Sequence, residues 1–326
     1  MSLRGQLLEH PPTVEQAADD YPRQLLHTPA SIPDAALPER ITRATSKQAY
    51  YTVRYLVDHV HTTQAYRAYA YFRWVDDMLD LHLSRHVERR AFVDRQQQLL
   101  ERGYRNDWQG EWRGDLAPEE RLLADLIQGD DEAESGLQSY MRNMMAVMAF
   151  DVDRRGRPIT SRELDDYTRY LATAATDALH YFIGHDHAPP RSAARYLAAT
   201  GAHITHMLRD TYEDVAAGYF NVPRELLESC GIGPRDIASE PYREWVSSRV
   251  RQARAYFRAG AVYLDHVKSL RCRIAGLAYM ARFTGILGAI EREGYLIRPS
   301  YPEFKRVSYG LRMGSSVFAH AVLRGN

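Results

Sequence analysis

The chain has 326 residues, of which 45% are hydrophobic, and its formal net charge is zero. This length suffices for one large or two medium domains with a sizeable core, and the charge balance lacks the basic excess typical of nucleic-acid-binding proteins. Two cysteines are too few for a disulfide framework, no apolar run reaches the length of a bilayer-spanning helix, and the N-terminus carries no apolar secretory signal. We therefore expect a cytoplasmic protein that binds no nucleic acid and has no stable membrane insertion.

The first 40 residues contain six prolines, a density that blocks regular helix and indicates an extended N-terminal arm. After Ser46 the apolar residues recur with helical periodicity, and Ser46 and Ser161 are expected N-caps. The predicted helices are 46–62, 64–82, 84–102, 118–128, 133–149, 161–183, 191–217, 241–268, 272–293 and 302–323. The sequence thus predicts a proline-rich arm, 1–40, followed by a single all-α domain, 41–326.

Two helices carry paired aspartates at a spacing of four residues. "YFRWVDDMLD" places Asp76 and Asp80 one turn apart, and "ITHMLRDTYEDVAAGYF" does the same for Asp210 and Asp214. Like charges at this spacing repel mildly, whereas Mg²⁺ takes one or two carboxylates and completes its shell with waters and substrate phosphates. Two facing pairs would hold a diphosphate through Mg²⁺.

The alternative for either pair alone is a solvated helix face. The flanking segments "AYFRWV" and "ITHML" are apolar and aromatic, so each helix is at least partly buried, and buried carboxylates without a partner are costly. A metal-binding role for all four aspartates is therefore the better explanation. Arg73 and Arg209 lie beside the pairs and would bind diphosphate oxygens, because a guanidinium can donate two hydrogen bonds at once.

These motifs resemble the squalene/phytoene synthase family of isoprenoid synthases over about residues 41–310. "ATSKQAYYTVRYL" looks like the family's opening segment, "AYAYFRWVDDMLD" its first aspartate motif, and "HMLRDTYEDVAAGYFNVPREL" its second. The resemblance implies an isoprenoid synthase fold, a helical bundle around a central apolar cavity, and Mg²⁺-assisted ionisation of a prenyl diphosphate. It also implies substrate-binding roles for Ser46, Lys47, Tyr50, Tyr69, Tyr170 and Arg209.

The sequence departs from the family pattern in two places. Where the family has a "VAGTVG"-like segment, this chain reads "AATDAL", so Thr176, Asp177 and Leu179 fill the space that small glycines leave open and introduce a carboxylate. His203 and His206 stand where the family has Gln and Asn. These changes suggest an acceptor that is partly polar, with Thr176 and the histidines binding it and Asp177 as a candidate proton acceptor.

On these departures the chain looks most like the branch of the family that prenylates aromatic rings such as carbazoles. The expected reaction transfers a short prenyl group, dimethylallyl from its diphosphate, to a carbazole- or indole-like acceptor in secondary metabolism. Two alternatives stay open at this point. One is head-to-head condensation of two prenyl diphosphates, and the other is a non-catalytic binding or assembly protein, which the intact aspartates disfavour.

Overall fold

The computed structural model describes residues 36–107, 116–190 and 192–302. The chain divides into two compact units, Met1–Leu37 and Pro38–Asn326. Most of the predicted arm lies outside the described residues, as does the predicted helix 302–323 apart from its first residue. Helix α2 (Leu37–Thr45) starts within the last four residues of that arm, so this part is helical. The division at residue 40 otherwise stays a prediction.

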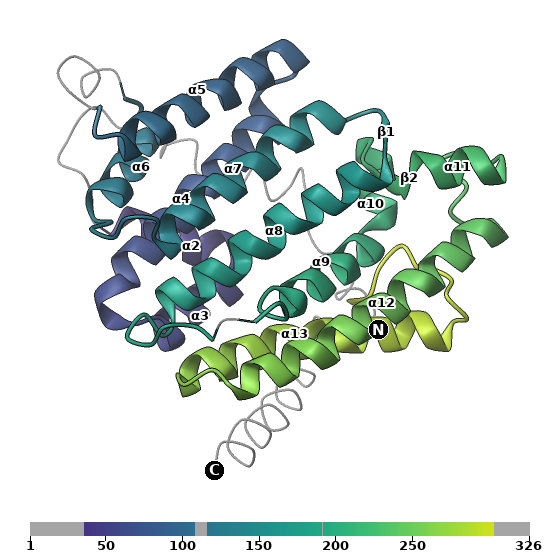
Figure 1. Cartoon of the computed structure of the whole chain (residues 1–326). Helices are drawn as coiled ribbons and strands as arrows, with labels where there is room; N and C mark the ends of the chain where they lie inside the picture. Colours follow the sequence, from purple (N-terminus) through teal and green to yellow (C-terminus); the bar gives the residue numbers. More distant parts are fainter. Residues whose placement is uncertain (1–35, 108–115, 191, 303–326) are drawn as a thin grey trace, which may run out of the picture. The chain divides into compact units, whose positions relative to one another are not determined.

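The described part of the chain is almost entirely helical, which confirms the predicted all-α class (Figure 1). After α2 the α-helices are α3 (Lys47–Leu56), α4 (Thr62–Asp77), α5 (His86–Tyr104), α6 (Pro118–Gln128), α7 (Gly136–Arg154), α8 (Ser161–Phe182), α9 (Leu197–Arg209), α10 (Thr211–Ala217), α11 (Arg224–Cys230), α12 (Glu240–Asp265) and α13 (Leu270–Arg292). Short elements join them: a 3₁₀ turn η2 (His59–His61), a π-helical turn η3 (Met78–His82), and two strands, β1 (Pro158–Ile159) and β2 (Phe220–Pro223).

The predicted helices match most of these bounds, with corrections at three places. The predicted helix 46–62 ends at Leu56, and 191–217 is divided between α9 and α10. Ser46 is an N-cap as expected, accepting a hydrogen bond from the Ala49 amide at 3.1 Å. The cap of α8 is Thr160 rather than Ser161, because Glu163 completes a capping box with Thr160.

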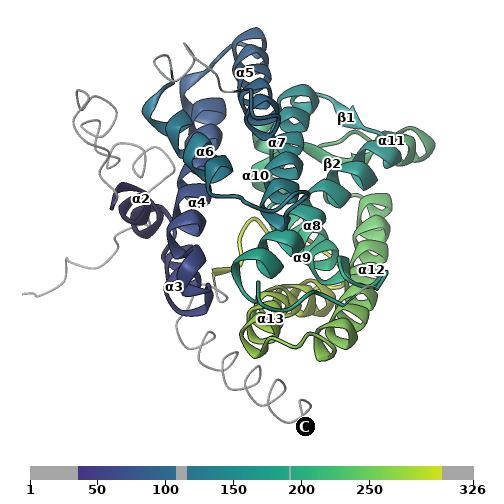
Figure 2. The ribbon, with the colours of Figure 1, turned by 60° about the vertical axis from the view of Figure 1, so that its left-hand side comes forward.

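The helices pack so that elements distant in sequence become neighbours (Figures 1 and 2). Helix α8 lies between α7 and α9, α9 packs against α12 and α13, and α13 reaches α3. Helix α3 packs on α4, which contacts α6 and α7, while α5 contacts α6 and α7. The parallel pairing of β1 with β2 joins the α7–α8 connection to the segment after α10. This pairing brings the end of α7 to the second aspartate motif.

Helix α13 satisfies the length and composition expected of a membrane-spanning helix, with a mean hydropathy of 1.2. Half of its apolar window is buried within the protein, as in the core helix of many proteins that do not enter a membrane. The expectation that no segment is long and apolar enough to span a bilayer is therefore wrong for α13.

Candidate active site

The first aspartate motif lies where α4 changes into a π-helical turn. The Leu83 amide donates to the Met78 carbonyl at 2.9 Å, a five-residue step that places Asp80 within the wider turn. Such turns are rare and often occur at functional sites. Arg73, one turn earlier, binds Asp76 at 3.3 Å and also pairs with Asp77. The motif therefore holds its own arginine between two of its carboxylates.

Burial makes these carboxylates hard to ionise. It raises the pKa of Asp76 to about 6, and the charge of Asp80 adds to that effect while Arg73 opposes it. Burial likewise raises the pKa of Asp80. Carboxyl groups in this state gain from any cation that approaches them.

The second motif lies at a junction between two helices. Helix α9 ends at Arg209, α10 begins at Thr211, and Asp210 between them has φ −97° and ψ 9°. The Asp214 amide still donates to the Asp210 carbonyl at 2.8 Å, which keeps one helical turn between the two aspartates. The two side chains therefore keep the shared face that the spacing predicts, although the helix is interrupted.

The two aspartates of this motif differ in their electrostatic state. Burial by itself raises the pKa of Asp210. Hydrogen bonds from Arg209 at 2.6 Å and from His206 at 2.8 Å outweigh burial and hold this pKa well below its usual range. Burial and the neighbouring Asp210 charge instead raise the pKa of Asp214 to about 6. Asp210 is thus fixed as an anion, while Asp214 remains poorly compensated.

A buried hydrogen-bond network that sequence reasoning missed supports Asp214. The Arg154 guanidinium donates to Asp151 at 2.5 Å and to the Asn221 side-chain oxygen at 2.7 Å. The Asn221 amide in turn donates to Asp214 at 2.7 Å, and the Tyr167 hydroxyl donates to Asp151 at 3.2 Å. Helices α7 and α8 and strand β2 are therefore connected to the second motif through paired polar groups.

Asp151 also connects the first motif to the second. Burial raises the pKa of Asp151, and the Asp80 charge contributes to that rise. The Asp151 charge contributes in the same sense to the raised pKa of Asp76. Burial raises the pKa of Tyr219, as do the charges of Asp80 and Asp151. The structure therefore brings both aspartate motifs to one end of the bundle, with Asp151 between them.

The squalene/phytoene synthase family profile matches residues 42–309, most of the chain. The chain belongs to this family. No curated protein sequence matches it. Among solved structures, squalene synthase HpnC from Alicyclobacillus acidocaldarius has a TM-score of 0.63 at 23% identity, covering 81% of this chain and 95% of that one. A dehydrosqualene synthase in complex with ligand has a TM-score of 0.64 at 16% identity, covering 88% and 96%. These similarities confirm the isoprenoid synthase fold.

Within this squalene/phytoene synthase fold, Arg155 is a further basic residue that the sequence analysis overlooked. Its Nη1 atom is buried and has no hydrogen-bond partner among the described residues. The guanidinium lies 5.6 Å from the ring centroid of Tyr219, and its charge opposes the raised pKa of Asp80. An unpaired guanidinium at this place suits a diphosphate oxygen. The sequence signal for it is the basic run "DRRGR" at the end of α7.

A second basic group lies beside the other motif. Arg282 of α13 hydrogen-bonds Gln48 of α3, and burial together with the Arg209 charge lowers the pKa of Arg282. This contact brings the start of α3 to the second motif. Of the residues predicted there, Lys47 is exposed and Ser46 uses its hydroxyl as a helix cap.

The three predicted substrate tyrosines make aromatic or local contacts. Tyr50 stacks on Tyr66 with centroids 6.2 Å apart, and Tyr69 accepts a hydrogen bond from Thr45 at 3.3 Å. Tyr170 belongs to a small apolar cluster on α7 and α8, with Arg169 over its ring at 4.5 Å. Their roles toward substrate stay predictions.

The two histidines lie at the second motif in different states. His206 is half exposed and pairs with Asp210. His203 is only 4% exposed, packs edge-on against Tyr167 with centroids 5.1 Å apart, and has no hydrogen-bond partner for either ring nitrogen in the part of the chain that the structure describes. Burial lowers the pKa of His203 to about 3, so the ring is neutral.

Asp177 lies far from the aspartate motifs, contrary to its predicted catalytic role. Its oxygens bind Ser139 at 2.6 Å and Arg195 at 2.7 Å. Ser139 lies near the start of α7 and Asp151 near its end, twelve residues or about 18 Å apart. Asp177 therefore cannot accept a proton next to the diphosphate. The adjacent Thr176 is buried.

The aspartate end of the bundle suits Mg²⁺ and a diphosphate together. Among the described residues no three His, Cys, Asp or Glu side chains are arranged to hold a metal ion by themselves. Mg²⁺ needs no such set, because substrate phosphates and waters complete its shell. The all-oxygen donors, with the raised pKa of Asp76 and Asp214, fit a hard cation.

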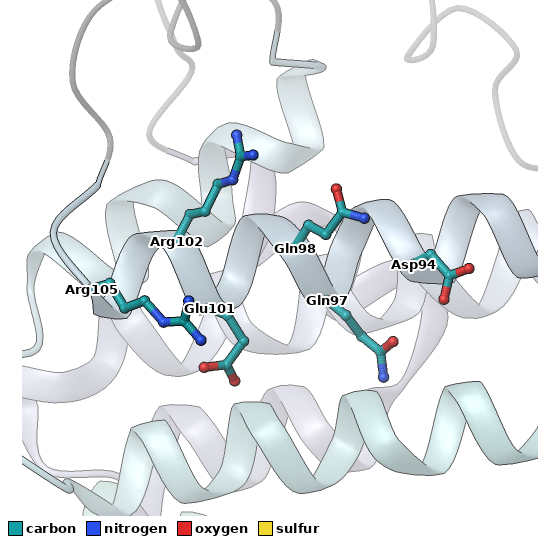
Figure 3. Close-up of a pocket in the computed structure, with 6 residues that line it drawn as sticks. All are labelled: Asp94, Gln97, Gln98, Glu101, Arg102 and Arg105. Carbon is teal, nitrogen blue, oxygen red and sulfur yellow. The ribbon is translucent and has the colours of Figure 1, made fainter.

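The surface of α5 carries a cavity of about 380 Å³, which five residues of this helix and Arg105 directly after it line (Figure 3). Two of its acidic groups are already paired, Glu101 with Arg142 and Asp94 with Arg90. We therefore do not assign the prenyl diphosphate chemistry to this cavity.

Proposed function

We propose that this chain is a Mg²⁺-dependent enzyme that condenses two prenyl diphosphates head to head. One observation carries the proposal: two aspartate motifs from separate parts of the chain share one end of the bundle with Asp151, Arg154 and Arg155. Membership of the squalene/phytoene synthase family supports it. Intact aspartates and the surrounding arginines make a non-catalytic binding role the poorer explanation.

Different residues of the site would have different roles in the ionisation of an allylic diphosphate. Asp80 and Asp214 would hold Mg²⁺, which when bound stabilises the negative charge that develops on the leaving diphosphate. Arg155 and Arg209 would bind its oxygens directly. Buried Tyr167 and His203 close the site against water, which would otherwise capture the cation.

The position of Asp177 shifts the balance away from aromatic prenylation. The expected aromatic acceptor rested on the departures at residues 174–179 and on the two histidines. Of these, the Asp177 carboxylate is bound by Ser139 and Arg195 instead. His203 gives this second candidate its remaining support, because a neutral imidazole without a partner could bind an acceptor hydroxyl. Dimethylallyl transfer to a carbazole- or indole-like ring therefore stays the alternative.

Product analysis by mass spectrometry separates these functions. The full chain is incubated with Mg²⁺ and farnesyl or geranylgeranyl diphosphate alone, and in parallel with dimethylallyl diphosphate and a carbazole or indole. We expect a C30 or C40 hydrocarbon or its cyclopropyl diphosphate from the first reaction and none from an Asp80→Ala control. Efficient prenylation of the aromatic ring, with no condensation product, would overturn the proposal in favour of the alternative. Inactivity in both reactions would contradict each of them.

A further inference from the structure

A second cavity, of about 250 Å³, lies between α8, α9 and α12. Its lining combines polar side chains, among them Arg249, Gln252 and Tyr256 of α12, with the apolar side chains of Ala172, Leu197 and Ile204. Its volume is just under the range of about 300–1,000 Å³ that is usual for pockets of drug-sized ligands, so it suits a smaller molecule.

This cavity is separate from the diphosphate site. Asp165 and Arg169 line it, and each stands two residues from Tyr167 on α8. Two residues of an α-helix turn through about 200°, so the cavity faces the side of α8 opposite to Tyr167. Tyr167 points to Asp151 and the aspartate motifs. The cavity therefore lies behind α8 as seen from those motifs.

Arg249 is an uncompensated cation inside this cavity. Its Nε atom is buried without a hydrogen-bond partner, and its Nη1 donates at 2.7 Å to Gln252, a neutral group. Burial lowers the pKa of Arg249, and the charge of Asp165 only partly offsets this. In the described part of the chain Arg249 makes no ion pair, whereas Arg254 on the same helix binds both carboxylate oxygens of Glu291.

A partly buried guanidinium without an anion is costly, and an oxyanion that it can bind with two hydrogen bonds would offset that cost. The second guanidinium in the cavity, Arg169, already pairs with Asp166. Asp165 adds one negative charge at an exposed position. The charged lining residues Asp165, Arg169 and Arg249 sum to plus one, which suits a singly charged anion better than a diphosphate, and the apolar lining residues favour a short hydrocarbon tail.

We propose that this cavity is a binding site for a small monocarboxylate with a short apolar tail, its carboxylate on Arg249 and its tail against Ala172, Leu197 and Ile204. The hydroxyl of Tyr256 and the amide of Gln252 lie on the same helix and can donate to the ligand once it displaces their mutual hydrogen bond of 2.9 Å. The proposal does not depend on the reaction at the aspartate motifs.

Binding of butyrate to the full chain tests the proposal, with inorganic phosphate and diphosphate as comparison anions and no Mg²⁺ present. Titration calorimetry and ligand-observed NMR should show butyrate binding more tightly than either comparison anion. Arg249→Gln removes the cation but keeps a polar side chain, and it should weaken butyrate binding at least tenfold. Arg251→Gln is the matched control, because Arg251 is exposed on the same helix and bonds only Ser247 among the described residues.

Several outcomes would overturn the assignment: no butyrate binding to the unmodified chain, equal binding by Arg249→Gln, equal weakening by Arg251→Gln, or a preference for diphosphate. Folding of each variant is checked by circular dichroism and urea denaturation. Arg249→Gln removes a partly buried charge that makes no ion pair among the described residues, so we expect it to be no less stable than the unmodified chain. If it nevertheless fails to fold, Arg249→Lys, which keeps the charge but lacks the planar fork, must still weaken butyrate binding.

Discussion

The two aspartates of the second motif should respond to the same substitution with opposite changes in stability. We consider Asp214→Asn and Asp210→Asn in the metal-free protein. The pKa of Asp214 is raised to about 6 by burial and by Asp210, whereas the pKa of Asp210 is held low by Arg209 and His206 against the effect of burial.

The raised pKa of Asp214 sets the size and pH range of its effect. The folded state binds this proton more tightly than the unfolded chain, so the stability it contributes is complete below about pH 4 and is lost as the pH rises through about 6. A pKa difference of about two units corresponds to about 3 kcal/mol, which solvent screening reduces to about 1–3 kcal/mol. Asparagine mimics the protonated acid, and its side-chain oxygen can still accept the hydrogen bond from Asn221. Asp214→Asn should therefore stabilise the protein by about 1–3 kcal/mol at pH 7.5, with the gain vanishing toward pH 4.

Asp210→Asn should do the reverse. In the unmodified chain the Asp210 carboxylate contributes stability that is present above about pH 4. This contribution is lost only as the pH falls through the lowered pKa of Asp210 in the folded state. Asparagine keeps the shape but not the charge that binds Arg209 and His206, so the variant should be destabilised at pH 7.5 and remain so down to about pH 4. The two variants thus differ in sign at neutral pH.

Urea denaturation in EDTA at pH 4.5, 6 and 7.5 measures both free energies of unfolding. With Mg²⁺ and a prenyl diphosphate, turnover should fall about 100-fold or more in both variants, because each removes a carboxylate from the charged site. Destabilisation of Asp214→Asn at pH 7.5, or unchanged turnover in it, would refute the view that Asp214 is an uncompensated carboxylate kept for a cation.

Three further substitutions test the rest of the site. Asp80→Ala should abolish turnover without changing the circular dichroism spectrum, and EDTA should inhibit the unmodified enzyme reversibly; activity in chelator would contradict a Mg²⁺ requirement. Arg73→Lys keeps the charge but loses the planar fork, so kcat/KM for the donor should fall at least about tenfold in steady-state assays. Arg154→Gln removes the only described cation bound to the partly buried Asp151 and leaves it the Tyr167 hydroxyl alone, so urea denaturation should show a loss of about 3–5 kcal/mol. A loss below about 1 kcal/mol would show that the network is not structural.

The local features of the site could be predicted from the sequence because they depend on neighbours within one turn. The spacing of Asp210 and Asp214 puts them on one face, and the hydrogen bond between Asp214 and Asp210 preserves that relation even where the helix breaks. The cap of α8 was misplaced by one residue for a similarly local reason: Thr160, not Ser161, stands three positions before Glu163.

The contacts that the sequence did not predict join residues far apart in the chain, and they leave no local sequence pattern. Asn221 is 67 residues from Arg154, and nothing in "GYFNVP" indicates that its amide will bind Asp214. The sequence around Asp177 likewise does not show its partner Ser139, which is 38 residues away. Periodicity assigns a residue to a face of a helix, whereas the partner on that face is set by tertiary packing.

In each pair of aspartates spaced by four residues, the first is bound by a cation of the protein and the second by none in the described part of the chain. Asp76 is held by Arg73, and Asp210 by Arg209 and His206. Within the described residues Asp80 makes no ion pair, and Asp214 has only the neutral amide of Asn221. The paired member fixes the geometry of its turn, and the unpaired member keeps an unfavourable negative charge that an incoming cation can neutralise. This unfavourable energy is relieved only when a cation binds, because none of the arginines that the structure describes lies within ion-pair distance of Asp80 or Asp214.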